Sequence, residues 1–313
     1  MLNRRLLRIK TLQILYAYYK SAYKSIADAE KELFYSVEKS YELYLMVLQI
    51  LPEIAHQAFL KADIIEQRIV LEKSDAIKYK RLANNHIINS IVENKELRNK
   101  LEKCSLNWND NQKLMRDFMA TVIESEIYVQ YLLEPQTFAG DKKIALYIIT
   151  DVLPVSESLD FYLEDKSIYW NDDIEFILEM VVKTIKSIDE QSGIDFELHS
   201  RFNNSSDREF IEILFRKTID DYNKYTDLIE KNLEHWKLDR VAEIDLLLIK
   251  MAIIESVQFP SIPLKVTLNE YIEIAKYYST DKSSLFINGM IDKIVKQLVE
   301  EKVIVKVGRG LND

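Results

Sequence analysis

An all-α fold is predicted, made of a helical bundle joined to an additional helical region. Glycine and proline number only five each in 313 residues, whereas average proteins contain roughly 12 per cent of the two combined. Few positions are therefore left for the turns and bulges on which β-rich and doubly wound folds depend. The chain is also 48% hydrophobic, so it can form a sizeable core, and its abundant Leu, Ile, Glu, Lys and Ala suit helices.

The first half of the chain shows repeated helical spacing of apolar residues. In residues 3–24, Leu12, Leu15 and Tyr16 fall on one face of a helix. Further helices are predicted at 26–50, from Pro52 to about 72, at 75–103 and at 112–133. The polar stretch from Ser105 to Asn111 is a predicted turn.

The second half continues the pattern on both sides of a linker predicted at 192–206. Helices are expected at 141–153, 171–190, 207–235, 238–257, 266–278 and 283–300. The run from Leu246 to Ile254 is apolar except for Lys250. A strand is possible by periodicity alone, but the helical length around it favours a buried helix. Ser283 or Ser284 is the expected N-cap of the last helix.

Charge is distributed unevenly along the chain. The net charge is −9, which argues against a generally basic nucleic-acid binder. Residues 151–200 carry 13 acids against three lysines, whereas residues 1–27 carry six basic residues and no acid. The acidity therefore belongs to one segment, and the N-terminus forms a separate basic arm.

Arg4, Arg5 and Arg8 lie within roughly 100° of arc if residues 3–20 are helical. The helix macrodipole at that end favours acids, so three arginines there work against local stability. Such a departure from a local rule often marks a functional site. Guanidinium groups suit phosphate oxygens, so the cluster indicates either an RNA or DNA contact or a solvated basic face.

No enzymatic constellation is recognised in the sequence. The four histidines share no metal-ligand spacing, and there is no glycine-rich phosphate loop or nucleophile elbow. Neither a metal nor a cofactor is therefore expected. The single cysteine, Cys104, fits a reducing, cytoplasmic compartment. No signal peptide is recognised, and no uncharged apolar run approaches the roughly 18 residues of a membrane span.

Four blocks of the sequence carry a family resemblance. Residues 262–276 read Ile-Pro-Leu-Lys-Val-Thr-Leu-Asn-Glu-Tyr-Ile-Glu-Ile-Ala-Lys, and residues 286–293 read Phe-Ile-Asn-Gly-Met-Ile-Asp-Lys. Upstream, Trp236 and Arg240 precede an apolar helix, and residues 4–16 join an arginine-rich start to Leu-Gln-Ile-Leu-Tyr. In this order and spacing, the blocks resemble the NusB family of transcription antitermination factors.

The resemblance implies a function and a set of contacts. NusB proteins bind the boxA element of nascent ribosomal RNA together with NusE, a ribosomal protein, and so help RNA polymerase elongation complexes to read through terminators. Residues implied to contact boxA-like RNA are Arg4, Arg5, Arg8 and Lys10, with Phe286 stacking on a base. Residues implied to contact NusE are Tyr16, Asp245 and Asp281. A plain core role for Phe286 or Tyr16 is the alternative.

Parts of the chain depart from the family. Its Asp-Ser pair before the last helix is replaced by Lys282-Ser283, and its Lys before the Phe by Leu285. The expected organisation is a basic first helix of a NusB-like domain at 1–24, a helical insertion or extra domain at 25–205, the C-terminal NusB-like core at 206–300 and a tail at 301–313. The alternative function is a helical protein–protein scaffold that does not bind RNA.

Overall fold

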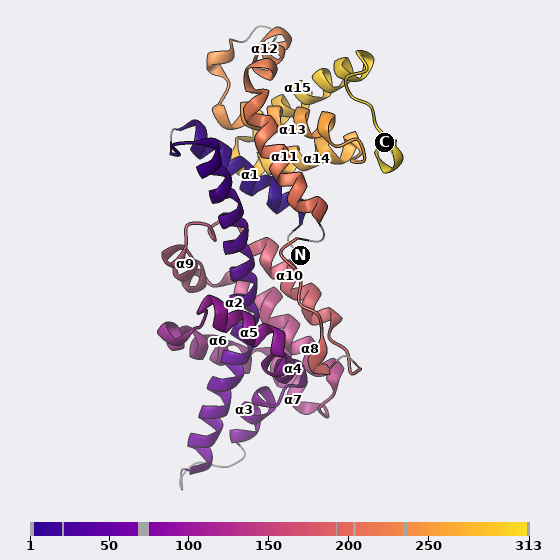
Figure 1. The fold of residues 1–313 in the computed structure, drawn as a ribbon. Coiled ribbons are helices and arrows are strands. Elements are labelled where there is room, and N and C mark those ends of the chain that lie inside the picture. Colours follow the sequence, from indigo (N-terminus) through magenta and orange to yellow (C-terminus); the bar gives the residue numbers. More distant parts are fainter. Residues whose placement is uncertain are drawn as a thin grey trace. The chain divides into compact units, whose positions relative to one another are not determined.

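The computed structural model describes residues 3–20, 22–67, 75–191, 193–202, 205–233 and 237–311, without the side chains of Asp281 and Lys282. Every regular element in these ranges is helical, which confirms the predicted all-α class (Figure 1). The chain divides into two compact units. Unit 1 is formed by Glu38–Arg201, and unit 2 combines Asn3–Val37 with Phe202–Asp313.

Unit 2 is built around one buried helix. Its helices are α1 (Arg4–Tyr19), the beginning of α2 (Ile26–Gln67), α11 (Ser205–Asp220), α12 (Tyr222–Asn232), α13 (Glu243–Gln258), α14 (Leu264–Tyr278) and α15 (Asp281–Glu300). Every residue of α13 from Asp245 to Ser256 is buried, because α1, α11, α12, α14 and α15 all pack against this helix (Figure 1). The expected buried helix is therefore confirmed, and the alternative of a strand is excluded.

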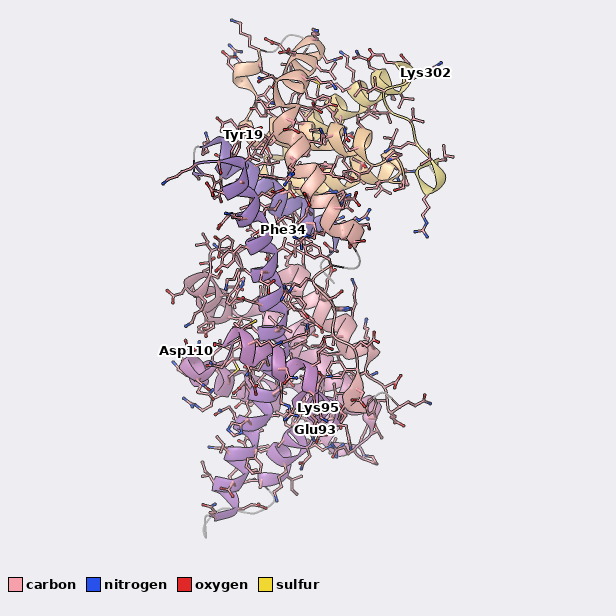
Figure 2. All side chains as sticks on the ribbon, viewed as in Figure 1. Tyr19, Phe34, Glu93, Lys95, Asp110 and Lys302 are labelled. Atoms are coloured by element: carbon pink, nitrogen blue, oxygen red, sulfur yellow. The ribbon has the colours of Figure 1, made fainter. Side chains whose placement is uncertain are left out.

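The first three turns of α2 belong to unit 2. Glu30 accepts two hydrogen bonds from Arg216 of α11, at 2.6 and 2.7 Å. The Arg208 guanidinium lies 4.8 Å from the ring centre of Phe34, which is labelled in Figure 2. The division therefore falls after residue 37 and after residue 201, compared with the expected boundaries after 24 and 205.

In unit 1, the later part of α2 is surrounded by shorter elements. These are α3 (Ala76–Ala83), α4 (His86–Glu93), α5 (Lys95–Cys104), α6 (Gln112–Glu124), α7 (Glu126–Leu133), α8 (Phe138–Tyr147), a π-helical turn η3 (Ile148–Val152), α9 (Glu157–Lys166) and α10 (Ile174–Ser187). The expected break at Pro52 is wrong, since Pro52 lies inside α2. Leu51 and Ile54 on either side are fully buried, and this packing offsets the cost of a proline inside a helix, which is about 3 kcal/mol.

Two segments predicted as single helices are divided by polar caps. The Asn85 and Asn94 side chains accept hydrogen bonds from the backbone N–H of Ile88 and Leu97, so 75–103 becomes three helices. Glu93 and Lys95 mark the second junction in Figure 2. Ser125 caps α7 in the same way and divides 112–133. The long helix expected at 207–235 is likewise two, α11 and α12.

The core of unit 1 is organised on α2. Trp108 is fully buried, and its indole N–H donates to the Met46 carbonyl at 2.9 Å. Trp170 donates in the same way to the Lys39 carbonyl at 2.8 Å. By length and composition α2 could span a membrane, but 67% of its most apolar window is buried inside the protein. That burial is typical of a core helix.

The C-terminal elements differ from expectation in detail. Thr280, and not Ser283 or Ser284, is the N-cap of α15, because its hydroxyl accepts from the Ser283 N–H. The chain after α15 returns to the end of α13, where the Val307 N–H donates to the Pro260 carbonyl at 3.1 Å. Trp236, which contributes to the family resemblance, lies outside the described residues.

Candidate nucleic-acid interface

The three arginines predicted to contact RNA lie on the first two turns of α1. Asn3 begins the helix, since its side chain accepts a hydrogen bond from the Leu6 N–H at 2.8 Å. Arg4, Arg5 and Arg8 each pair with a carboxylate from a different helix of unit 2. Local helix electrostatics disfavour cations at this end, and these carboxylates provide the compensation.

Arg8 forms a buried ion pair with Glu255 of α13. Its Nε and Nη2 donate to the two carboxylate oxygens at 2.7 and 2.6 Å. The Arg8 side chain is 2% exposed and that of Glu255 is 0% exposed. Such a two-pronged geometry is the strongest form of ion pair between these residue types. Arg8 is therefore a structural link between α1 and α13 as well as a source of charge.

The Glu255 carboxylate is further satisfied by two hydroxyl groups of α14. Thr267 donates at 2.9 Å and Tyr271 at 3.1 Å. Burial and the Glu255 charge raise the pKa of Tyr271 well above its ordinary value, so its hydroxyl keeps its proton. Burial alone would lower the pKa of Arg8, but the charge and hydrogen bonds of Glu255 outweigh that effect and raise it. Arg8 therefore keeps its charge at neutral pH.

Arg5 and Arg4 lie nearer the solvent. Arg5 donates to both oxygens of Glu270 at 2.9 Å, and these hydrogen bonds raise the pKa of Arg5. Arg4 donates through Nε to Asp207 at 3.0 Å. The Arg4 side chain is 41% exposed and that of Arg5 is 34% exposed. Both guanidinium groups can therefore be reached by a ligand from outside.

A shallow pocket of about 370 Å³ opens at this cluster. Its lining residues are Asn3, Arg4, Arg5, Arg8, Ile262, Val266 and Glu270. Val266 is 45% exposed, so one side of the pocket offers an apolar surface beside the charged groups. The combination can receive a negatively charged oxygen together with a flat or apolar neighbouring group.

Burial corrects two of the sequence-based site assignments. Lys10 is 1% exposed, so its ammonium group is not available to an RNA phosphate in this structure. Asp245 is 4% exposed, and its carboxylate accepts a hydrogen bond from Ser279 at 2.5 Å. Both side chains lie on helix faces that are buried in the structure, and the periodicity of the sequence did not predict this burial.

The remaining predicted contacts lie on α1 and α15. Tyr16 is 36% exposed, and the Lys20 ammonium lies 5.5 Å from its ring centre. Phe286 is half-buried on α15. Asp281 begins α15, but its side chain lies outside the described part. The three arginines contact α11, α13 and α14, and the expected proximity of Phe286 to them stays a prediction.

The sequence did not show that three acids pair with these arginines. Asp207, Glu255 and Glu270 come from three helices, and only the tertiary structure assembles them around α1. One of them could have been suspected from the sequence. Glu255 ends an apolar run in a helix without a polar face, where a charged residue requires a partner.

Unit 1 contains a separate pocket of about 640 Å³ beside the beginning of α4. His86 lines it, and its Nδ1 lies 2.6 Å from the buried Asp141 carboxylate. The same carboxylate accepts from the backbone N–H of His86 at 2.8 Å, so Asp141 anchors the first turn of α4. Within the described residues, no group of three or more His, Cys, Asp or Glu side chains could hold a metal.

Comparison with known proteins gives matches to one family. Residues 176–296 match the model of the NusB family. The transcription antitermination protein NusB of Salinibacter ruber is 40% identical over 140 residues, which are 42% of this chain and 87% of that protein. The NusB protein of Bacillus pumilus is 32% identical over 117 residues, which are 37% of this chain and 86% of that protein. No solved structure matches this chain.

Fold and site together define an all-helical protein whose first helix carries a guanidinium-lined surface pocket. This chain belongs to the NusB family. The matched region ends within α15 and excludes α1, but the ion pairs of Arg4, Arg5 and Arg8 attach α1 to the matched helices.

Proposed function

We propose that this protein is a cytoplasmic transcription antitermination factor that binds a boxA-like element of nascent ribosomal RNA together with NusE. The observation that carries the proposal is that Arg4 and Arg5 line the pocket together and that the guanidinium groups of both remain partly exposed to solvent. Membership of the NusB family supports it. The RNA polymerase elongation complex is the indirect partner.

Each arginine has a distinct part in the proposed site. Arg4 and Arg5 contact RNA phosphates from the rim, because their guanidinium groups are partly exposed. Arg8 lies deeper in the pocket and attracts the phosphate through its positive charge, while two hydrogen bonds to Glu255 fix the orientation of its guanidinium group. Phe286 supplies a stacking surface for a base, an interaction worth about 1–3 kcal/mol in single-stranded binding.

Replacing Arg4 and Arg5 together by alanine is expected to weaken RNA binding and reduce its salt dependence. A lost phosphate contact lowers the slope of log affinity against log salt by up to about 0.7 for single-stranded RNA, and by less where the arginine must first release an internal carboxylate. The measurement is a fluorescence titration with a short boxA-like RNA at several salt concentrations. Arg8 is left unchanged, because its loss would also disturb the core of unit 2.

A matched control removes two cations elsewhere in unit 2. Lys217 and Lys296 are 44% and 71% exposed and lie on α11 and α15, outside the pocket lining. Their double replacement by alanine changes the net charge equally. If this control weakens binding as much as loss of Arg4 and Arg5, general electrostatic attraction explains the affinity and the proposed site is wrong.

The competing function is a helical scaffold that binds protein but not RNA, which the acidic segment 151–200 would favour. A pull-down of purified NusE by the full chain, with and without boxA-like RNA, separates the two. The proposed function predicts that RNA increases the retained NusE and is itself retained. A scaffold retains NusE equally in both conditions and leaves the RNA in solution.

A further inference from the structure

Glu270 occupies the position in the arginine pocket that an anionic ligand would need. Its Oε2 lies 2.9 Å from Arg5 Nε and 3.6 Å from Arg8 Nη1, and its Oε1 lies 2.9 Å from Arg5 Nη2. One carboxylate oxygen therefore lies between two guanidinium groups. The same side chain lines the pocket.

Carboxylate and phosphate compete for the same face of a guanidinium group. Both present two oxygens that match the paired N–H donors of arginine, so Arg5 cannot hold both in this geometry. The Arg5–Glu270 pair is 34% and 21% exposed, whereas the Arg8–Glu255 pair is 2% and 0% exposed. The outer pair can thus open while the inner pair keeps α1 in place.

We infer that Glu270 is an intramolecular competitor of the RNA phosphate and sets the affinity of the site. This inference rests on the proposed function. On binding, a phosphodiester of single-stranded RNA replaces the Glu270 carboxylate, which moves into solvent. The phosphate oxygens then lie against Arg5 Nε and Nη2 and face Arg8 Nη1, the groups that Glu270 now faces.

The exchange has a consequence for salt dependence. In the wild type, Arg5 must break its ion pair with Glu270 before it can form one with an RNA phosphate. The number of paired charges therefore changes little on binding. Glu270→Gln keeps the size of the side chain and one amide oxygen but removes the competing charge. The slope of log affinity against log salt should therefore steepen in this variant, by up to about 0.7.

The inference is tested by titrating the 313-residue protein with a fluorescent boxA-like single-stranded RNA at several salt concentrations. Glu270→Gln is expected to bind the RNA about fivefold more tightly than the wild type. This factor corresponds to the upper end of the range of energies measured for exposed ion pairs. The matched control is Glu273→Gln, one turn further along α14. Glu273 pairs with Lys276 at 2.5 Å and lies outside the pocket lining. Its charge acts on Arg5 without a hydrogen bond, so its loss changes the same charge but leaves the Arg5–Glu270 pair closed.

An Arg5→Ala background provides a second test. There Glu270 has lost its main partner, so Glu270→Gln should change RNA affinity by less than about twofold. Circular dichroism establishes that each variant is folded. The inference is overturned if wild type binds but Glu270→Gln binds no more tightly, if Glu273→Gln gains as much, or if the gain persists without Arg5. If none of the folded proteins binds the RNA, the proposed function fails instead.

Discussion

Replacing Glu255 with glutamine is expected to lower the free energy of unfolding of unit 2 by about 3–5 kcal/mol. The substitution leaves the Arg8 guanidinium, which is 2% exposed, charged and buried without its hydrogen-bonded counter-ion, and only Glu270, 3.6 Å from its Nη1, remains near that charge. Native-state hydrogen exchange at the amides of α13 measures the effect, because these amides report on unit 2 alone. Loss of protection there should accompany unchanged protection of α6 and α10 in unit 1.

The exposed pair between Glu30 and Arg216 is the matched control. It has the same two-pronged geometry, at 2.6 and 2.7 Å, and it also belongs to unit 2. The Arg216 side chain is 54% exposed, so water can solvate it after Glu30→Gln, and the loss should be much smaller. Equal losses from the two variants would mean that burial is not what makes the Arg8–Glu255 pair important.

Replacing Lys250 with methionine is expected to stabilise the protein, by up to about 5 kcal/mol at pH values below 7. Lys250 is fully buried in α13, and its ammonium has no hydrogen-bond partner among the described residues. It lies 2.9 Å from the ring centre of Tyr222, an attraction that compensates only part of the lost hydration. Burial lowers the pKa of Lys250 from 10.5 to about 7.

The sign of the pH dependence follows from that lowered pKa. Between about 7 and 10.5 the unfolded chain binds the Lys250 proton and the folded chain does not, so wild-type stability rises with pH in this window. Below 7 the full penalty of the buried charge applies. The advantage of Lys250→Met should therefore shrink as the pH rises toward 10.5. Urea unfolding of both proteins across this window measures it.

Lys265→Met is the control for this pH profile. Lys265 is exposed on α14, so its replacement should shift stability little and equally at every pH. If the Lys250→Met advantage were constant from pH 7 to 10.5, the side chain would keep its proton in the folded chain throughout this window, and the lowered pKa of Lys250 would be contradicted.

Several structural features could be anticipated from local sequence alone. The scarcity of glycine and proline indicated helices throughout, and the described residues bear this out. Boundaries were harder to anticipate. Asn85 and Asn94 sit within a continuous amphipathic pattern, and their capping role becomes visible only in the folded chain, where Asn94 also donates to the carbonyls of Ile194 and Phe196.

The candidate site could likewise be predicted only in part from the sequence. Helical spacing was enough to place Arg4, Arg5 and Arg8 together, and they do share the lining of one pocket. The same spacing could not show that Lys10 is buried or that Glu270 covers Arg5. Exposure depends on which helices surround α1, and those helices follow it by about 200 residues or more.

The all-α class, the family and the position of three guanidinium groups at the start of the first helix could all be predicted from the amino-acid sequence. These follow from composition, motif spacing and helical geometry, which are local properties of the chain. Which of these cations are accessible, and which are paired with carboxylates, depends on how the helices pack. The physical reason is that Asp207, Glu255 and Glu270 come from three different helices, and desolvation and ion pairing arise only when those helices pack around α1.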